Sequence, residues 1–237
     1  MASSNRSAMI GARLRVMTTP IKLDIWSDVI CPWCYIGKRR LEAGIAQYQQ
    51  SPDALLIEVE YHSFELSSDT PVDFDGSVAD FLADRKGMSR EQATQMLQHV
   101  TDTAASVGLD YNFDQVQHTN TLKAHELLHF ASAHGKQSEL QERLMRAYFT
   151  EGRHIGRDAD LADLAADIGL DREEALHALA NGTYGEAVRD DIRTAMQLGI
   201  TGVPFFVIDG TFGISGAQPP EVFAEALAKA EADRNDT

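Results

Sequence analysis

The sequence predicts an α/β fold in which two distant parts of the chain share one sheet and a block of helices is inserted between them. Three observations support this prediction. Residues 21–64 show a strand, a helix and a second strand, residues 65–199 show helices without a further clear strand, and residues 200–237 show two strands and a helix. Because the crossover of a βαβ unit is nearly always right-handed, the first two strands are expected to be parallel neighbours.

The elements of the first unit follow from residue periodicity. Apolar and polar residues alternate over residues 21–26, which is typical of a strand with one buried face. A helix is predicted from Pro32, with apolar residues at helical spacing as far as Tyr48. It should stop before Pro52, because the residue ahead of a proline disfavours the helical conformation. A second strand is predicted over residues 55–64.

The middle of the chain is predicted to be helical because polar N-cap residues and glycine stops recur along it. The expected helices span residues 89–106, 120–134, 136–151, 158–168, 171–181 and 184–198. Two of them begin at an aspartate, Asp158 and Asp171. Each carboxylate is expected to accept hydrogen bonds from the free N–H groups of the first helical turn.

The last part of the chain is predicted to be a hairpin followed by a helix. Two apolar runs, residues 205–208 and 212–214, are separated by Asp209 and Gly210. An Asp-Gly pair is typical of a tight hairpin, because a type I′ turn needs positive φ at both central residues. The final helix is expected to start at residues 219–220, where proline suits a first turn, and to end near residue 233.

The charge balance excludes two classes of partner. The 237 residues include 36 acidic and 21 basic side chains, for a formal net charge of −15. Such a field repels nucleic-acid phosphates and anionic lipids, so neither nucleic acid nor a membrane surface is an expected partner. No stretch approaches the roughly 18 to 20 consecutive apolar residues that a membrane-spanning helix needs. The oligomeric state stays open.

Residues 1–20 are interpreted as a flexible N-terminal leader. They contain three arginines and no acid, but their longest apolar run, residues 8–10, is far shorter than the core of a secretory signal. Met17 stands just ahead of the first strand and favours an over-extended start, with a transit peptide as the alternative. A cytoplasmic location is therefore expected.

The chain contains two cysteines, Cys31 and Cys34, placed at the predicted start of the first helix. A helix N-terminus presents unpaired N–H groups and a partial positive charge, which favour a thiolate over a thiol. Cys31 is therefore the candidate nucleophile on a disulfide, and Cys34 is the candidate thiol that resolves the mixed disulfide. Two alternatives are a zinc site, which would need two further ligands, and a pair of inert buried cysteines.

Residues 26–37, which surround the Cys-Pro-Trp-Cys motif, resemble the DsbA-like thioredoxin superfamily and specifically its FrnE-like branch. The other matching segments are residues 62–66, 120–121, 124–125, 148–152, 202–208 and 213–219. The resemblance implies a thioredoxin fold with a large inserted all-helical domain. Residues 21–64 and 200–237 would form the discontinuous thioredoxin-fold domain, and residues 65–199 the insertion.

The resemblance also implies a protein-disulfide oxidoreductase. Cys31 and Cys34 would be catalytic, and Pro204 would be a cis-proline facing them, with the Val203 backbone offered to an extended substrate as an added strand. The substrate-binding residues would be Pro32, Trp33, Val203 and Pro204. The expected partner is a disulfide- or thiol-bearing protein, peptide or small molecule. We expect no metal and no cofactor beyond the redox-active disulfide, although glutathione can serve as a co-substrate.

The sequence departs from the DsbA and thioredoxin pairs in having Pro-Trp between the cysteines, with no histidine to donate to the thiolate. The redox potential of the pair therefore stays open within the range of about −270 to −120 mV that disulfide couples of this fold span. The direction of electron flow stays open as well. Asp24 stands where related proteins carry a buried acid near the second cysteine, and Asp28 competes for that role. The alternative for Asp24 is a plain solvated strand residue.

Residues 125–129 match the H-E-x-x-H pattern of zinc metalloproteases. His125 and His129 share one helix face, so coordination is geometrically allowed. The extended metzincin pattern fails, because Ser132 and Gly135 stand where it needs glycine and histidine. We favour a helix whose second face meets solvent or the other domain.

Two other function classes are retained. One is a glutathione-dependent isomerase or transferase of the kappa or 2-hydroxychromene-2-carboxylate isomerase type, which is similar in layout but usually carries serine in place of the pair. The other is a non-catalytic holdase that uses the cleft of the helical block. In a reducing cytoplasm the pair would rest largely as the dithiol if its potential lies well above that of the glutathione pool, which suggests reductase or isomerase work.

Overall fold

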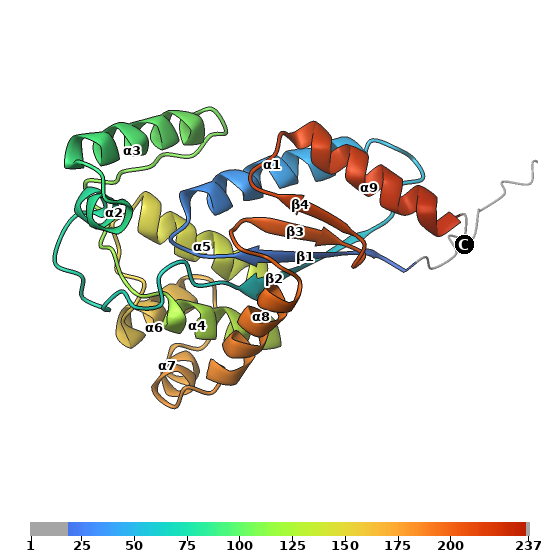
Figure 1. Ribbon diagram of the computed structural model, residues 1–237. Helices are drawn as coiled ribbons and strands as arrows, with labels where there is room; N and C mark the ends of the chain where they lie inside the picture. Colours follow the sequence, from blue (N-terminus) through green and yellow to red (C-terminus); the bar gives the residue numbers. More distant parts are fainter. Residues whose placement is uncertain (1–18, 236–237) are drawn as a thin grey trace, which may run out of the picture.

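A computed structural model describes residues 19–235, so residues 1–18 of the predicted leader lie outside the described residues. The elements shown in Figure 1 are β1 (Ile21–Ser27), α1 (Pro32–Tyr48), β2 (Ile57–Ser63), α2 (Val78–Lys86), α3 (Arg90–Ala105), α4 (Leu122–Ala133), α5 (Gln137–Phe149), α6 (Asp158–Asp167), α7 (Arg172–Ala180), α8 (Gly185–Gln197), β3 (Phe205–Ile208), β4 (Phe212–Ser215) and α9 (Pro220–Asn235). No helix within residues 19–235 is long and apolar enough to cross a membrane.

The sheet has four strands in the order β2-β1-β3-β4. β1 pairs with β2 in parallel and with β3 antiparallel, and β3 and β4 form an antiparallel hairpin. Asp209 and Gly210 in the hairpin turn have φ values of 49° and 68°, as expected for an Asp-Gly turn. The predicted α/β class, with helices inserted between the two parts of the sheet, is confirmed.

The two faces of the sheet are covered by different parts of the chain. Helices α1 and α9 lie side by side over one face, and α8 with α4 lies on the other (Figure 1). The alternation along β1 explains both contacts. Leu23 and Ile25 share a core with Phe223 of α9, whereas Trp26 points the opposite way and packs against Ala195 of α8.

The crossing of α1 and α9 depends on Gly44. A Cβ atom at this position would lie 2.6 Å from the carbonyl oxygen of Pro220 and 2.7 Å from the Cβ atom of Phe223. The backbones of the two helices therefore approach more closely than any side chain at residue 44 would allow.

The predicted helices are found within a few residues of their expected ends, with two corrections. Helix α2 was not predicted, although Ser77 and Asp80 form a capping box at its start. The predicted cap at Asp158 was wrong, since Arg157 is the N-cap residue of α6 and Asp158 lies in the first turn. The cap at Asp171 is confirmed, because its carboxylate accepts a hydrogen bond from the Glu174 N–H at 2.9 Å.

The inserted helices are held against α1 by ion pairs around Glu142 of α5. The Glu142 carboxylate accepts hydrogen bonds from the Tyr35 hydroxyl at 2.5 Å, from Lys38 Nζ at 2.6 Å and from Arg39 Nη2 at 2.5 Å. Burial alone would raise the pKa of Glu142, but these donors outweigh it and lower the pKa to about 2. The contact fixes the insertion directly beside the helix that carries the cysteines.

Candidate active site at the start of α1

Both cysteines are free thiols in the first turn of α1, and both are almost fully buried. Cys31 is the N-cap residue, with extended φ and ψ of −82° and 113°, and Pro32 follows at the first helical position. The Cys31 N–H donates to the carbonyl of Asp28 at 3.1 Å, which closes the turn between β1 and α1. Strand β1 thus delivers Cys31 to the helix N-terminus, where backbone N–H groups stabilise negative charge.

The loop ahead of β3 covers Cys31. The Sγ atom of Cys31 donates to the Val203 carbonyl at 3.7 Å, and the Val203–Pro204 peptide bond is cis. Gly37 of α1 makes this approach possible, because a Cβ atom there would lie 3.0 Å from Cγ of Pro204. Residues separated by 172 positions in the sequence therefore meet at one sulfur.

The Cys34 thiol lies behind Cys31 and within hydrogen-bonding reach of it. Burial raises the pKa of Cys34 well above its usual value, and its hydrogen bond to Cys31 raises it further. The Ser27 side chain and the Asp28 backbone oppose this rise by hydrogen bonding to the sulfur. Ser27 Oγ in turn accepts from Nε2 of Gln141 at 3.2 Å, so α5 of the insertion also reaches the second cysteine.

Asp24 does not supply the buried acid near the second cysteine. Side chains alternate along a strand, so Asp24 and Ser27 lie on opposite faces of β1, and only Ser27 is on the side of Cys34. Asp24 instead pairs with His62 and Lys22.

Asp28, the competing candidate, is fully buried in the turn that leads to Cys31. Its Oδ2 atom accepts from the Leu66 N–H at 2.8 Å, and Oδ1 lies 3.4 Å from Nε2 of His125. Asp28 therefore ties the redox turn to the segment after β2 and to helix α4. This role, like those of Ser27 and Gln141, was not predicted, because partners so distant in sequence leave no local pattern.

The two histidines of the H-E-x-x-H pattern lie in separate surroundings. His125 faces Asp28, whereas Nε2 of His129 lies 3.1 Å from Oγ of Ser63 and 3.0 Å from the carboxylate of Asp191. The second face of α4 therefore meets the end of β2 and the turn before Cys31. Of the two expected surroundings, solvent and the other domain, this is the second.

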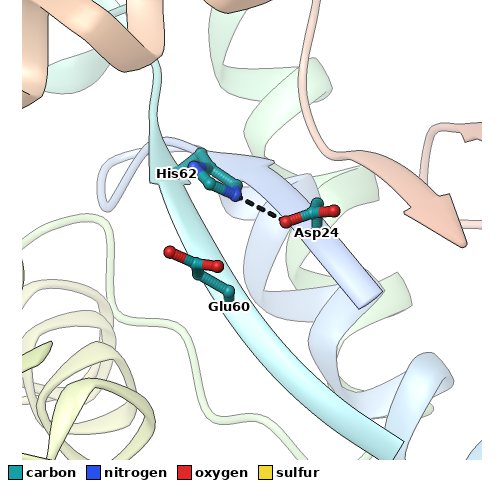
Figure 2. Close-up of side chains that lie close together, drawn as sticks. All are labelled: Asp24, Glu60 and His62. Atoms are coloured by element: carbon teal, nitrogen blue, oxygen red, sulfur yellow. Dashed lines mark hydrogen bonds and ion pairs between the residues drawn. The ribbon is translucent and has the colours of Figure 1, made fainter. Parts of the chain in front are cut away.

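Three side chains on the sheet face opposite α1 could in principle hold a metal ion: Asp24, Glu60 and His62, whose ligand atoms lie within 4.8 Å of one another (Figure 2). Their groups already have partners. His62 Nε2 bonds to Asp24 at 2.8 Å, as the dashed line in Figure 2 shows. Lys22 Nζ lies 3.0 Å from Asp24 and 2.9 Å from Glu60. A cation bound here would have to displace this ammonium group, so the arrangement fits an ion-pair network better than a metal site.

A cavity of about 360 Å³ opens beside the cysteines. Four of the predicted site residues line it together: Cys31, Pro32, Trp33 and Val203. Cys34 and Pro204 lie behind these four and are not part of the wall. Tyr111, which had not been singled out, fixes the turn by donating from its hydroxyl to the Pro32 carbonyl at 2.7 Å.

A mixed sheet interrupted by a helical insertion, with two thiols on the first turn of α1 beneath a cis-proline loop, defines a thioredoxin-like fold of the DsbA type. The family model of the DSBA-like thioredoxin domain matches residues 22–228. The chain therefore belongs to the DSBA-like thioredoxin domain family, as the motifs of the sequence implied.

Known relatives agree with this assignment. The chain is 33% identical over 214 residues to the uncharacterized protein YwbO of Bacillus subtilis (strain 168), covering 90% of this chain and 97% of the relative. The structure of the probable DsbA oxidoreductase SCO1869 from Streptomyces coelicolor is 40% identical, with 90% of each chain covered and a TM-score of 0.83. The cytosolic disulfide reductase DsbM from Pseudomonas aeruginosa, solved with GSH, is 19% identical, with 89% of this chain and 99% of DsbM covered and a TM-score of 0.63, which shows the shared fold alone.

Proposed function

We propose that this protein is a thiol-disulfide oxidoreductase of the FrnE-like branch that acts through Cys31 and Cys34 on disulfides of proteins, peptides or small molecules. The observation that carries the proposal is the placement of two free thiols on one helical turn, with the first under the Val203 carbonyl and beside a cavity. The similarity to a probable DsbA oxidoreductase at 40% identity supports the same function.

The reaction transfers two electrons from the cysteine pair to the substrate. The Cys31 thiolate attacks one sulfur of the substrate disulfide, the substrate S–S bond breaks, and the other sulfur leaves as a thiolate that takes up a proton. Cys34 then loses its proton and attacks Cys31. The mixed disulfide breaks, the second substrate thiol leaves, and Cys31 and Cys34 remain joined. A dithiol donor, or two glutathione thiols that leave as glutathione disulfide, returns the pair to its reduced form.

The surroundings assign roles to the other site residues. The substrate backbone would pair with the segment at Val203 as an added strand, which replaces the present Cys31–Val203 contact. Pro204 shapes that segment, Pro32 starts the helix that presents Cys31, and Trp33 lies half-exposed at the cavity rim. Each of these contacts positions the disulfide for in-line attack.

We further propose that the protein works as a reductase or isomerase in the cytoplasm. Burial raises the pKa of Cys34, so that sulfur keeps its proton until the resolving step. In a compartment whose glutathione pool is more reducing than the pair, the cysteines rest as the dithiol, which is the form that donates electrons to a substrate disulfide.

Insulin reduction with a dithiol donor tests the proposal. The wild-type protein should reduce insulin, Cys31→Ser should be inactive, and Cys34→Ser should accumulate a mixed disulfide with the substrate. Absence of turnover by the wild-type protein, or unchanged turnover in Cys31→Ser, would overturn it. A glutathione-dependent isomerase would instead bind glutathione tightly and keep its activity in Cys34→Ser. A holdase would suppress aggregation equally well with both cysteines replaced.

A further inference from the structure

The cavity beside Cys31 has a mainly apolar wall, and Arg85 and Lys86 are the charged side chains that line it. Eight large apolar side chains are exposed within residues 19–235, and three of them, Trp33, Leu66 and Met96, line this one cavity. Deeper in, Leu82 and Val100 from α2 and α3 continue the apolar surface. Single exposed apolar side chains are ordinary on a protein surface, but several around one cavity indicate a binding surface.

One polar group in the cavity wall lacks a partner. His118 is 4% exposed and lines the cavity, and its Nε2 atom has no hydrogen-bond partner among the described residues. Its other ring nitrogen, Nδ1, lies 2.9 Å from the Tyr148 hydroxyl. Leaving a buried polar nitrogen unpaired is costly, so a ligand that satisfies it gains affinity and selectivity.

The missing partner has a definable chemistry. Burial lowers the pKa of His118 to about 4, so the ring is neutral near pH 7 and one of its nitrogens carries the hydrogen. If Tyr148 donates to Nδ1, then Nε2 is a donor; if Tyr148 accepts, then Nε2 is an acceptor. A hydroxyl group can both donate and accept, so it satisfies either tautomer, which a carboxylate or an ammonium group cannot do.

We infer that this cavity is a specificity subsite for a tyrosine side chain two residues from the reactive cysteine of a peptide or protein disulfide, with the phenol ring against the apolar part of the wall and its hydroxyl at His118. The inference rests on the proposed oxidoreductase function and names its substrate class. A volume of about 360 Å³ lies near the lower end of the roughly 300 to 1,000 Å³ typical of ligand pockets, so it suits one aromatic group.

The occupant is a side chain of the substrate because the cavity shares its wall with the groups that bind the substrate backbone and sulfur. Val203 and Cys31 both line it. Side chains alternate along an extended chain, so a peptide that pairs with Val203 while its cysteine meets Cys31 directs the side chain two residues away towards the same surface, where the cavity opens.

The test measures the reduction of four disulfide peptides that differ only in the residue two positions from the cysteine: Tyr, Phe, Leu or Gly. Each cysteine is joined to the same chromogenic thiol, and the full-length protein is recycled by a dithiol donor. Relative to Gly, we expect kcat/KM to rise about tenfold or more for Phe and Tyr, because an aromatic ring is buried. Tyr should exceed Phe about two- to tenfold, because its hydroxyl pairs with His118.

Two variants and a matched control separate the subsite from the chemistry. Met96→Trp narrows the cavity mouth and should bring the Tyr-to-Gly ratio towards one, whereas Met196→Trp places the same substitution on exposed α8, outside the cavity, and should keep the ratio. His118→Leu should abolish the preference for Tyr over Phe. If His118→Leu fails to fold, the comparison of Met96→Trp with Met196→Trp still shows whether the cavity determines the Tyr-to-Gly ratio.

Failure of the subsite is distinguishable from failure of the proposed function. If no peptide is reduced, the oxidoreductase assignment fails. If the Gly peptide is reduced and the four values of kcat/KM agree, or if Met196→Trp changes the ratio as much as Met96→Trp does, the subsite is wrong. N-acetyl-tyrosinamide should inhibit reduction of the Gly peptide only weakly. Inhibition at concentrations well below the KM of the Tyr peptide would identify a free phenolic ligand and overturn the peptide assignment.

Discussion

Burial and the neighbouring Cys31 hold the proton on Cys34, and the groups that oppose them are the Ser27 side chain and a backbone group rather than an acid. Ser27 bonds to the sulfur, and the buried Gln141 donates to Ser27, which leaves the Ser27 hydroxyl hydrogen available to Cys34. A neutral hydroxyl stabilises a thiolate by a single hydrogen bond and cannot itself take up the proton at neutral pH. The proton of Cys34 must therefore leave by way of the departing substrate sulfur or water.

Replacing Ser27 by alanine tests this arrangement. Without the hydroxyl, the thiolate of Cys34 loses a hydrogen bond, so the pKa of Cys34 should rise further and the resolving step should slow about two- to tenfold at pH 7. Thiolate absorbance against pH, measured in a Cys31→Ala background, gives the pKa, and single-turnover kinetics with the pair intact give the rate.

Ser63→Ala is the matched control for Ser27→Ala. Ser63 is equally buried at the end of β2, but it contacts His129 rather than a cysteine. An unchanged pKa of Cys34 in Ser27→Ala, or an equal rise in Ser63→Ala, would show that Ser27 has no specific role.

Two glycines of helix α1 allow close packing against different parts of the chain. The absence of a side chain at Gly37 leaves room for Pro204, and its absence at Gly44 leaves room for α9. Gly37→Ala should press on Pro204 and lower kcat/KM for insulin about tenfold or more, since small displacements of positioning groups are costly. Gly44→Ala should instead lower the free energy of unfolding by about 1–3 kcal/mol through overpacking, while the folded protein keeps its kcat/KM. Denaturant unfolding and steady-state kinetics on both variants check this, and equal effects on activity would contradict it.

The contact between α1 and α5 should make stability depend on pH in the acid range. The pKa of Glu142 in the folded protein is about 2, below its ordinary value of about 4.3 in an unfolded chain. The stabilisation is therefore complete above pH 5 and is lost as the pH falls from about 4.3 through 2. Glu142→Gln should lose roughly 2 kcal/mol of unfolding free energy at pH 7 and less at pH 3, after allowance for solvent screening.

Urea unfolding at pH 7 and pH 3 measures the effect of Glu142→Gln. The exposed Glu225 of α9 offers a matched control, because Glu225→Gln should change the unfolding free energy little at either pH. A cost of Glu142→Gln that is the same at both pH values would show that charge is not the cause.

The elements that could be predicted from the sequence are those with local signals. The alternation of apolar and polar residues predicted β1, and the Asp-Gly pair predicted the hairpin. The two cysteines at a strand–helix junction predicted the reactive pair. Helix α2 was missed although its ends carry local signals, a capping box at Ser77 and Asp80 and a left-handed glycine at Gly87. The role of Ser27 was missed because Gln141 stands 114 residues away, and such a pairing is decided by tertiary packing.

At the scale of the whole molecule, a second network ties the insertion to the sheet. Asp191 of α8 bonds to His62 of β2 at 2.8 Å and to the Ser63 N–H at 2.7 Å. Burial opposes protonation of His62, but hydrogen bonds to Asp191 and Asp24 prevail and raise its pKa above the ordinary value. The pKa of Asp191 is lowered despite its burial, because His129 and His62 donate to it.

Stability should therefore fall on the alkaline side as His62 loses its proton. A raised pKa in the folded state means that the contribution is complete below about pH 6.5, the unfolded value, and is lost as the pH rises through the folded value. His62→Gln should destabilise the protein by roughly 2 kcal/mol at pH 6 and flatten this decline. Thermal unfolding across pH 6 to 9 measures it, with the exposed His177→Gln as control. A decline that persists unchanged in His62→Gln would assign it to another group.

The position of β1 between β2 and β3 has a consequence for the nascent chain on the ribosome. Cys31 and Cys34 emerge early, but the strand and the carbonyl that cover Cys31 come from beyond residue 200, after the whole insertion has been translated. Until then the thiols lie on an incomplete sheet with an open edge at β1. The chain thus acquires a shielded nucleophile only once residues beyond 200 have been made, and the thiols stay open to stray exchange while the insertion is being translated.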